Sequence, residues 1–458
     1  MNQPDHPLAT VQPTGCGRRE HRGLLEKESS CEVTLENVLH PENIAEAWKR
    51  VRSNKGAAGT DGMSIGDFPS FAKEHWETIR NKLAAGSYSP SPVRRVQIPK
   101  GGGKYRLLGI PTVLDRVIQQ AISQVLTPHY DPTFSEHSHG FRPLRNAHDA
   151  IDEMQKEAEA KGRRCHVVDC DLEAFFDTVD HQKLMGKLRE RITNQELLKL
   201  ILRYLKAGVI LPNGKLKESQ KGVPQGGPLS PLLANILLDE LDAELEKREH
   251  KFVRYADDFV ILCGSLRAGE RILKNIRRYL TGSLKLTVNS AKSKVAKLPE
   301  ASFLGFQIIR RRVQWTEKSQ KKFKAEIRRI THRTRGHSPV KVLADLRAYT
   351  RGAMNYYAKG MKFGEARDLN KWLRSRMRLY YWKQWGRPRT RRWKLLKLGI
   401  RREEVHKASR SRKGPWRMSH NSLVHRALTN EWLTEQGLPS IENQWNLIRY
   451  PEGPKKRE

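Results

Sequence analysis

Two adjacent carboxylates, Asp257 and Asp258, interrupt an otherwise mostly apolar stretch of the chain. The apolar positions around them are Phe252, Val253, Tyr255, Phe259, Val260, Ile261 and Leu262. Their spacing predicts a tight hairpin over residues 252–263, with both carboxylates at its tip. An acidic turn is ordinarily no more than a solvated turn. Two apolar strands, however, are buried and would hold this turn rigidly, so we interpret the pair as a candidate catalytic site.

A second acidic cluster lies upstream, where Asp169 and Asp171 fall on the same side of a strand predicted for residues 165–171. If this strand lies beside the hairpin, Asp171 converges with Asp257 and Asp258. Like charges at such a distance persist only when they are protonated or when cations neutralise them. Carboxylate oxygens suit Mg²⁺, and two such ions ~3.5–4 Å apart serve an in-line phosphoryl transfer. These residues therefore predict a centre with two Mg²⁺ ions, held by Asp171, Asp257 and Asp258.

The elements that must position these carboxylates mix strands and helices without a regular βαβ period, which predicts an α+β fold. A hairpin with basic residues near its turn is expected over residues 92–111, and helices are expected over 43–51, 115–130, 230–249 and throughout the chain beyond 318. Residues 1–36 are polar and aperiodic, which indicates a flexible leader, and the Gly- and Ala-rich residues 55–62 indicate a loop. At 458 residues, the chain suits two or three domains.

The charge of the chain indicates a polyanionic partner. Lys and Arg number 86 against 50 Asp and Glu, which gives a formal charge of +36. Residues 301–458 hold 40 of the cations and 12 of the acids, a surplus of 28, so the first 300 residues carry only +8. The same last third holds eight of the ten tryptophans. We expect most of these tryptophans to be core residues rather than stacking platforms for bases.

The compartment is indicated by the cysteines and by the absence of apolar runs. The five cysteines form no C-x-x-C pair and have no histidines at zinc spacing, as expected of unpaired thiols in a reducing cytosol. No signal peptide and no stretch of eighteen apolar residues occurs. We expect a soluble, cytoplasmic protein with no membrane partner.

Three motifs together resemble those of the reverse transcriptases. Residues 255–258, Tyr-Ala-Asp-Asp, resemble the signature hairpin of that family, and Asp171 with Phe176 resembles the first catalytic aspartate and the aromatic gate against a ribose 2′-hydroxyl. Residues 222–231, Gly-Val-Pro-Gln-Gly-Gly-Pro-Leu-Ser-Pro, resemble the loop that contacts nucleotide and template, which assigns substrate binding to Gln225 and Gly226. We also expect Ser230 to be the N-cap of the helix that follows, because its hydroxyl and the next proline suit a helix start. The resemblance implies a right-hand polymerase fold with fingers and palm.

Four further cations match motifs of the same family. Lys292 resembles the lysine proposed to protonate the leaving pyrophosphate, while Lys104 and Arg106 resemble the fingertip cations that hold the incoming triphosphate. Arg142, in Gly140-Phe141-Arg142-Pro143, matches a motif to which we assign no role from the sequence.

Within this family the chain is most similar to the bacterial group II intron reverse transcriptases, or maturases. Residues 54–62 resemble their N-terminal extension, residues 346–357 their thumb or maturase segment, and residues 413–416 the start of a small DNA-binding region. The domains expected are a leader (1–36), the extension (37–90), fingers and palm (91–310), an all-helical thumb or maturase domain (311–395) and a small basic DNA-binding region (396–458). The resemblance and the charge together assign nucleic-acid contacts to Arg351, Arg374, Arg376, Arg378, Lys383, Arg387, Arg389, Arg391 and Arg392.

The expected partners are intron RNA, target DNA, an RNA template with a DNA primer, and dNTPs. A homodimer is compatible with the resemblance. No cysteine follows Cys263, so a zinc-stabilised His-Asn-His endonuclease cannot be built from these residues, and we expect the endonuclease-lacking type. Two alternatives stay open. The first is a reverse transcriptase of a retron, a diversity-generating element or an antiviral system. The second is a non-enzymatic RNA splicing factor, which the intact carboxylates and Phe176 argue against.

Overall fold

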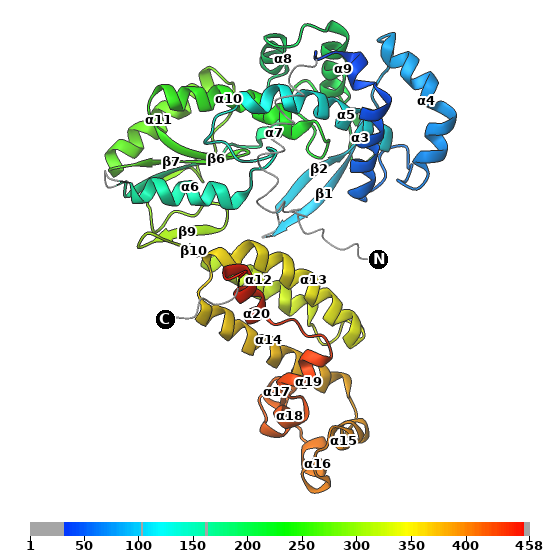
Figure 1. The fold of residues 1–458 in the computed structure, drawn as a ribbon, viewed down its shortest axis with the longest axis vertical. Coiled ribbons are helices and arrows are strands. Elements are labelled where there is room, and N and C mark those ends of the chain that lie inside the picture. The colour runs from blue at the N-terminus through cyan, green and yellow to red at the C-terminus, as the bar shows by residue number, and fades with distance from the viewer. Residues whose placement is uncertain (1–31, 102–103, 161–163, 453–458) are drawn as a thin grey trace. The chain divides into compact units, whose positions relative to one another are not determined.

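A computed structural model describes residues 32–101, 104–160 and 164–452 (Figure 1). The chain divides into two compact units, and the boundary lies between Phe303 and Leu304. We call the part before Leu304 the polymerase unit and the part from Leu304 onward the helical unit. Most of the expected leader, with Cys16 and Cys31, lies outside the described residues.

One four-stranded antiparallel sheet of the polymerase unit, called the palm sheet below, carries the predicted carboxylates. Its order is β6-β7-β3-β8. The strands are β3 (His166–Cys170), β6 (Lys251–Tyr255), β7 (Asp258–Cys263) and β8 (Lys294–Lys297). The predicted hairpin over 252–263 and the predicted strand over 165–171 are therefore both confirmed, and they are neighbours in one sheet. Helix α11 (Leu266–Gly282) packs against β3, β7 and β8, and α6 (Ala147–Glu159) packs against β6.

A second four-stranded sheet carries the predicted basic hairpin. Its order is β2-β1-β4-β5, and β1 (Val93–Gly101) pairs with β2 (Lys104–Ile110) in antiparallel register. The short strands β4 (Val209–Ile210) and β5 (Leu216–Lys217) complete this sheet.

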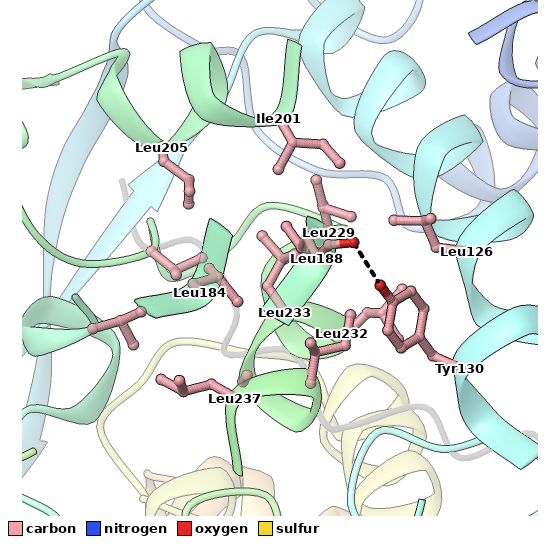
Figure 2. Packing of buried hydrophobic residues seen from close by; sticks show 14 of the residues in the cluster. Leu126, Tyr130, Leu184, Leu188, Ile201, Leu205, Leu229, Leu232, Leu233 and Leu237 are labelled. Atoms are coloured by element: carbon pink, nitrogen blue, oxygen red, sulfur yellow. Dashed lines mark hydrogen bonds between the residues drawn. The ribbon is translucent and has the colours of Figure 1, made fainter. Parts of the chain in front are cut away.

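The helices of the polymerase unit surround one apolar core. They are α2 (Leu35–Val38), α3 (Pro41–Ser53), α4 (Phe68–Ala84), α5 (Val113–Tyr130), α7 (Phe175–Thr178), α8 (His181–Arg189), α9 (Gln195–Lys206) and α10 (Ser230–Lys247), together with α6 and α11. Figure 2 shows leucines of α8, α9 and α10 packed beside Leu126 and Tyr130 of α5, with the Tyr130 hydroxyl donating to the Leu188 carbonyl at 3.4 Å. Leu237 of α10 is fully buried there. Truncating such a leucine to alanine costs roughly 2–5 kcal/mol, so this core fixes α10 under the palm sheet.

In the described residues, the helical unit contains one hairpin, one short 3-10 helix (Ala358–Gly360) and otherwise only α-helices. Its elements are β9 (Phe306–Ile309), β10 (Arg312–Trp315), α12 (Glu317–Ile330), α13 (Pro339–Tyr357), α14 (Phe363–Gln384), α15 (Pro388–Lys397), α16 (Arg402–Ser409), α17 (Pro415–Ser419), α18 (Ser422–Ala427), α19 (Asn430–Glu435) and α20 (Ile441–Arg449). The expectation of helices beyond residue 318 is confirmed. Half of its eight tryptophans are buried, namely Trp315, Trp382, Trp385 and Trp445, whereas Trp393 and Trp416 are exposed. None of the helices in the described ranges is long and apolar enough to cross a membrane.

Candidate active site

The strand register brings the three predicted carboxylates to one end of the palm sheet. Asp169 of β3 lies opposite Val260 of β7, and Cys170 lies opposite Phe259. The same antiparallel register, continued by one residue, sets Asp171 against Asp258 at the start of β7. Asp257 occupies the turn between β6 and β7. The sequence predicted that these three carboxylates converge if the two strands are neighbours. The strands are neighbours, and the carboxylates lie at the same end of the sheet.

The electrostatics of these carboxyl groups reflect their mutual proximity. The pKa of Asp258 is raised to about 6. Although the residue as a whole is exposed, desolvation by the surrounding protein is the largest cause, followed by the negative charges of Asp257, Asp171 and Asp169. The pKa of Asp169 is also raised, first by desolvation, and Asp171 adds to that shift. Negative charge gathered in this way is stabilised by a cation.

Lys292 supplies one such cation. Its Nζ lies 2.7 Å from Oδ2 of Asp171. Asp171 is fixed on both sides of its backbone, because its N–H donates to Oγ of Ser293 at 3.0 Å and its carbonyl accepts from the Asn289 N–H at 2.9 Å. The Asn289–Ser293 segment thus holds Lys292 next to the Asp171 carboxylate. The sequence predicted that these two residues take part in the same reaction.

The donor set fits divalent cations. Hard carboxylate oxygens that converge from two neighbouring strands match the preference of Mg²⁺ for oxygen ligands. Within the described ranges, no group of three or more His, Cys, Asp or Glu side chains is placed so that it could hold a metal ion by itself. Magnesium commonly keeps several waters and is bound by one or two carboxylates together with substrate phosphates.

Phe176 is tied to the loop that the sequence assigned to nucleotide binding. The ring is buried, and the Phe176 carbonyl accepts from the Val223 N–H at 2.6 Å. Gly222 adopts a left-handed φ of 94°, and a Cβ there would lie 2.9 Å from the Phe176 carbonyl oxygen. Only glycine permits this approach, so the loop after Lys221 fixes the backbone that carries Phe176.

The predicted fingertip and loop residues contact one another. Nε of Arg106 on β2 donates to Oε1 of Gln225 at 3.4 Å. The Gly109 N–H donates to the Gln225 carbonyl at 2.7 Å, and a Cβ on Gly226, whose φ is 120°, would lie 2.3 Å from the Gly109 carbonyl oxygen. The loop therefore docks onto β2. The side chain of Lys104 lies outside the described part of the structure.

The assignment of Ser230 as an N-cap is wrong. Ser230 is the first residue of α10, the N-cap is Leu229, and no side chain caps this helix. The Ser230 hydroxyl instead donates to the Pro224 carbonyl at 2.6 Å, which closes the loop on itself. Pro231 does lie in the first turn, as expected.

A buried ion pair, which our interpretation of the sequence missed, supports the turn between β6 and β7, called the catalytic turn below because the sequence predicts catalytic residues there. Arg254 on β6 and Asp242 on α10 are both fully buried, and Nε of Arg254 donates to Oδ1 of Asp242 at 2.7 Å. Nη1 of Arg254 donates at 3.0 Å both to Oδ1 of Asn235 and to the carbonyl of Ala256, which has a left-handed φ of 59°. The guanidinium therefore fixes the unusual backbone conformation immediately before Asp257. An arginine inside an apolar strand was the available signal, because a buried cation requires a partner.

Residues 137–142 cover the same turn and explain the Gly-Phe-Arg-Pro motif. The His139 N–H donates to the Arg254 carbonyl at 2.9 Å, and the Arg254 N–H donates to the His137 carbonyl at the same distance. Asn235 Nδ2 donates to the Gly140 carbonyl at 2.8 Å, and a Cβ on Gly140 would lie 2.2 Å from the Ala256 nitrogen. We call residues 137–142 the clasp.

Arg142 holds the clasp together from inside. Its guanidinium is buried, and it donates to Oδ1 and to the carbonyl of Asp131, at 2.8 Å each, and to the carbonyls of Ser135 and Ser138. Glu153 accepts from the rings of both His137 and His139. The segment is thus rigid and contacts the backbone of the catalytic turn directly.

The structure separates the predicted nucleic-acid contacts into two groups. Arg378 is buried and donates to the Leu428 carbonyl at 2.9 Å, while Arg376 donates to Oγ1 of Thr331 at 2.9 Å. Their donors stabilise the helical unit, so we exclude both from the RNA-binding set. Arg391 lies half-buried over the ring of Trp382 at 4.8 Å, and Arg374 is also half-buried. The exposed members are Arg351, Lys383, Arg387, Arg389 and Arg392.

Comparisons with known proteins agree with this geometry. Residues 98–308 match the family described as "Reverse transcriptase (RNA-dependent DNA polymerase)", and residues 320–399 match "Group II intron, maturase-specific domain". Protein YkfC of Escherichia coli is 35% identical over 324 residues, which cover 62% of this chain and 84% of YkfC. Group II intron-encoded protein LtrA of Lactococcus lactis is 31% identical, with 62% of this chain and 58% of LtrA covered. A putative COX1/OXI3 intron 2 protein of Saccharomyces cerevisiae is 28% identical, with 57% of this chain and 37% of that protein covered.

Proposed function

We propose that Asp171, Asp257 and Asp258 hold two Mg²⁺ ions for DNA synthesis. The premise is that this chain belongs to the group II intron reverse transcriptases, which are RNA-directed DNA polymerases with a maturase domain. The observation that supports this most directly is the convergence of these carboxylates at one end of the palm sheet, where desolvation and then the neighbouring negative charges raise the pKa of Asp258. When bound, the two ions supply activation of the primer 3′-hydroxyl and stabilisation of the leaving pyrophosphate.

The residues around the carboxylates have complementary roles in the proposal. Lys292, held at Asp171, donates a proton to the departing pyrophosphate, and Arg106 binds the incoming triphosphate next to the Gln225 and Gly226 backbone. Phe176 excludes a ribose by its bulk, because its backbone is fixed by the loop at Gly222. The substrates of this site are an RNA template with a DNA primer and dNTPs.

We assign the second activity, binding of intron RNA in support of splicing, to the helical unit. Its exposed cations Lys383, Arg387, Arg389 and Arg392 lie on and around α15, within or next to the residues that match the maturase-specific domain. Phosphate contacts by such side chains give sequence-independent affinity that falls with salt. Together the two units would copy intron RNA into DNA at a target site, by target-primed reverse transcription.

The test replaces the metal ligands and leaves the RNA-binding cations in place. Asp257→Ala with Asp258→Ala should abolish Mg²⁺-dependent cDNA synthesis and leave the affinity for a group II intron transcript unchanged, because the two activities use different residues. Glu218→Ala with Glu300→Ala, two exposed acids of the same unit, serves as the matched control for loss of two negative charges. Synthesis that survives in the aspartate variant, or loss of both activities together, would contradict the assignment.

A further inference from the structure

One face of α11 carries four cations in a single line. Arg267, Arg271, Lys274 and Arg278 follow one another at spacings of four, three and four residues, so they lie on the same side of the helix. All four are exposed, whereas Gly269, Ile276 and Leu280 are buried on the side that packs against the palm sheet. We call these four residues the palm stripe. It extends about 16 Å along the helix axis.

The palm stripe lacks the carboxylate partners that several other cations of this unit have. Arg50 pairs with Glu46, Lys187 with Glu190, and Arg248 with Glu244. No ion pair joins a stripe residue to a carboxylate anywhere in the described ranges, although Glu270 lies on the same helix. Like charges at i,i+4 destabilise a helix by roughly 0.2–0.5 kcal/mol per pair. The stripe therefore carries a small folding cost, which an external polyanion would relieve.

The stripe borders a recess with the same charge. A cavity of about 660 Å³ is lined by Arg271 and Asn275 of α11 and by Arg164, Arg248, His250 and Lys251. Arg164 forms an ion pair with Glu157, and Arg248 forms one with Glu244. Glu249 also lines the recess. Lys251 has no carboxylate partner in the described part of the chain. The pKa of His250 is lowered, first by burial and then by Arg248, as expected where positive charge gathers.

The recess and the first residues of the stripe lie at the end of the palm sheet away from the carboxylates, and the stripe side chains are on the side of α11 that does not pack on the sheet. Lys251 begins β6 and Cys263 ends β7, whereas Tyr255 and Asp258 at the other ends of these strands flank the catalytic turn. Four to five residues of strand separate the two ends, or about 15 Å. A ligand that occupies the recess is therefore neither the incoming nucleotide nor the primer end.

We infer that the palm stripe and its recess bind the sugar-phosphate backbone of RNA, as a docking surface separate from the active site and from the helical unit. Regularly spaced, unpaired cations along one face of a helix are complementary to the regular row of phosphates on one strand, and the recess beside them is lined mainly by charged and polar residues. The inference rests on the proposed function in one respect, since the RNA would be a structured part of the intron RNA.

The test replaces the four stripe cations by glutamine, a good helix former (Arg267→Gln, Arg271→Gln, Lys274→Gln and Arg278→Gln). Affinity is measured across a salt series for a group II intron transcript, a short RNA duplex and vesicles that contain anionic phospholipid. The slope of log K against log salt should fall by about three units on both RNAs if all four cations meet phosphates. Primer extension on a preformed primer and template should keep its kcat and KM.

A charge-matched variant separates specific contacts from the general field. Lys49→Gln, Arg50→Gln, Lys187→Gln and Lys285→Gln lower the net charge by the same amount, but remove cations that already pair with carboxylates. Equal slopes in the two variants, or a loss confined to vesicles, would overturn the inference. If the parent protein neither binds the intron transcript nor makes cDNA, it is the proposed function that fails; if the parent does both, a failure belongs to the palm stripe alone.

Discussion

Replacing Gly140 by alanine tests whether the clasp positions the catalytic turn. The added methyl carbon would lie 2.2 Å from the Ala256 nitrogen and 2.8 Å from the Tyr255 carbonyl carbon, whereas ordinary contact begins at 3.4 Å. The backbone of either the clasp or the turn must therefore move by about 1 Å. Alanine is otherwise acceptable there, because Gly140 does not have a left-handed φ. The perturbation is thus purely steric.

The expected magnitude follows from that displacement. A misplacement of ~1 Å in a catalytic constellation costs on the order of 10²-fold in rate, which corresponds to about 2.7 kcal/mol of transition-state stabilisation. Overpacking at a buried backbone contact costs a further ~1–3 kcal/mol of folding stability, and a folded protein of this size should tolerate that loss. We expect kcat for single-nucleotide incorporation to fall about a hundredfold, with a much smaller change in KM for the dNTP.

The assay is single-turnover extension of a preformed primer and template, with the melting temperature and intron RNA affinity measured on the same samples. Gly186→Ala in α8 is the matched control, because a methyl group there meets nothing within 4 Å. Unchanged kcat in folded Gly140→Ala protein would refute the positioning role. An equal loss in Gly186→Ala would refute it as well.

Three further predictions concern separate parts of the chain. Phe176→Ala should admit ribonucleotides, since bulk alone excludes the 2′-hydroxyl, and unchanged sugar discrimination in single-nucleotide incorporation would remove Phe176 from that role. Replacing the four exposed cations of the helical unit by glutamine should flatten the slope of intron RNA affinity against salt by about three units and leave primer extension unchanged; these are Lys383, Arg387, Arg389 and Arg392. Superimposable slopes in filter binding would mean that these charges are only solvated. Hydrogen bonds from His137 and His139 outweigh burial and lower the pKa of Glu153 to about 2, while the Glu153 hydrogen bond raises the pKa of His137. The stability that Glu153 contributes is fully present above its unfolded pKa of 4.5 and is lost as the pH falls toward 2. The stability that His137 contributes is complete below pH 6.5 and is lost at higher pH. Glu153→Gln should therefore lower the melting temperature most between pH 4.5 and 6.5. A difference from the parent that stays constant with pH would contradict this linkage.

The sequence by itself determined the local elements around the site. An acidic pair between two apolar runs favours a hairpin with buried strands, and β6 and β7 form it. The glycines of the substrate loop likewise marked positions where backbone approaches backbone, and Gly222 and Gly226 have the left-handed φ that this requires. Such features depend on residues that are close together in the chain, so they can be predicted from the sequence without a structure.

The tertiary structure alone decided which side chains meet across the chain. Asp171 faces Asp258 because β3 pairs with β7 in one register, and Arg254 finds Asp242 only because α10 packs under the sheet. The tertiary structure also decided which cations are buried. Arg378 and Arg392 belong to the same basic run, yet Arg378 donates to a carbonyl inside the helical unit and Arg392 is exposed. Charge and spacing are properties of the sequence. Which face of a helix becomes covered depends on what packs against it, because desolvating a guanidinium is tolerated only where acceptors are already in place.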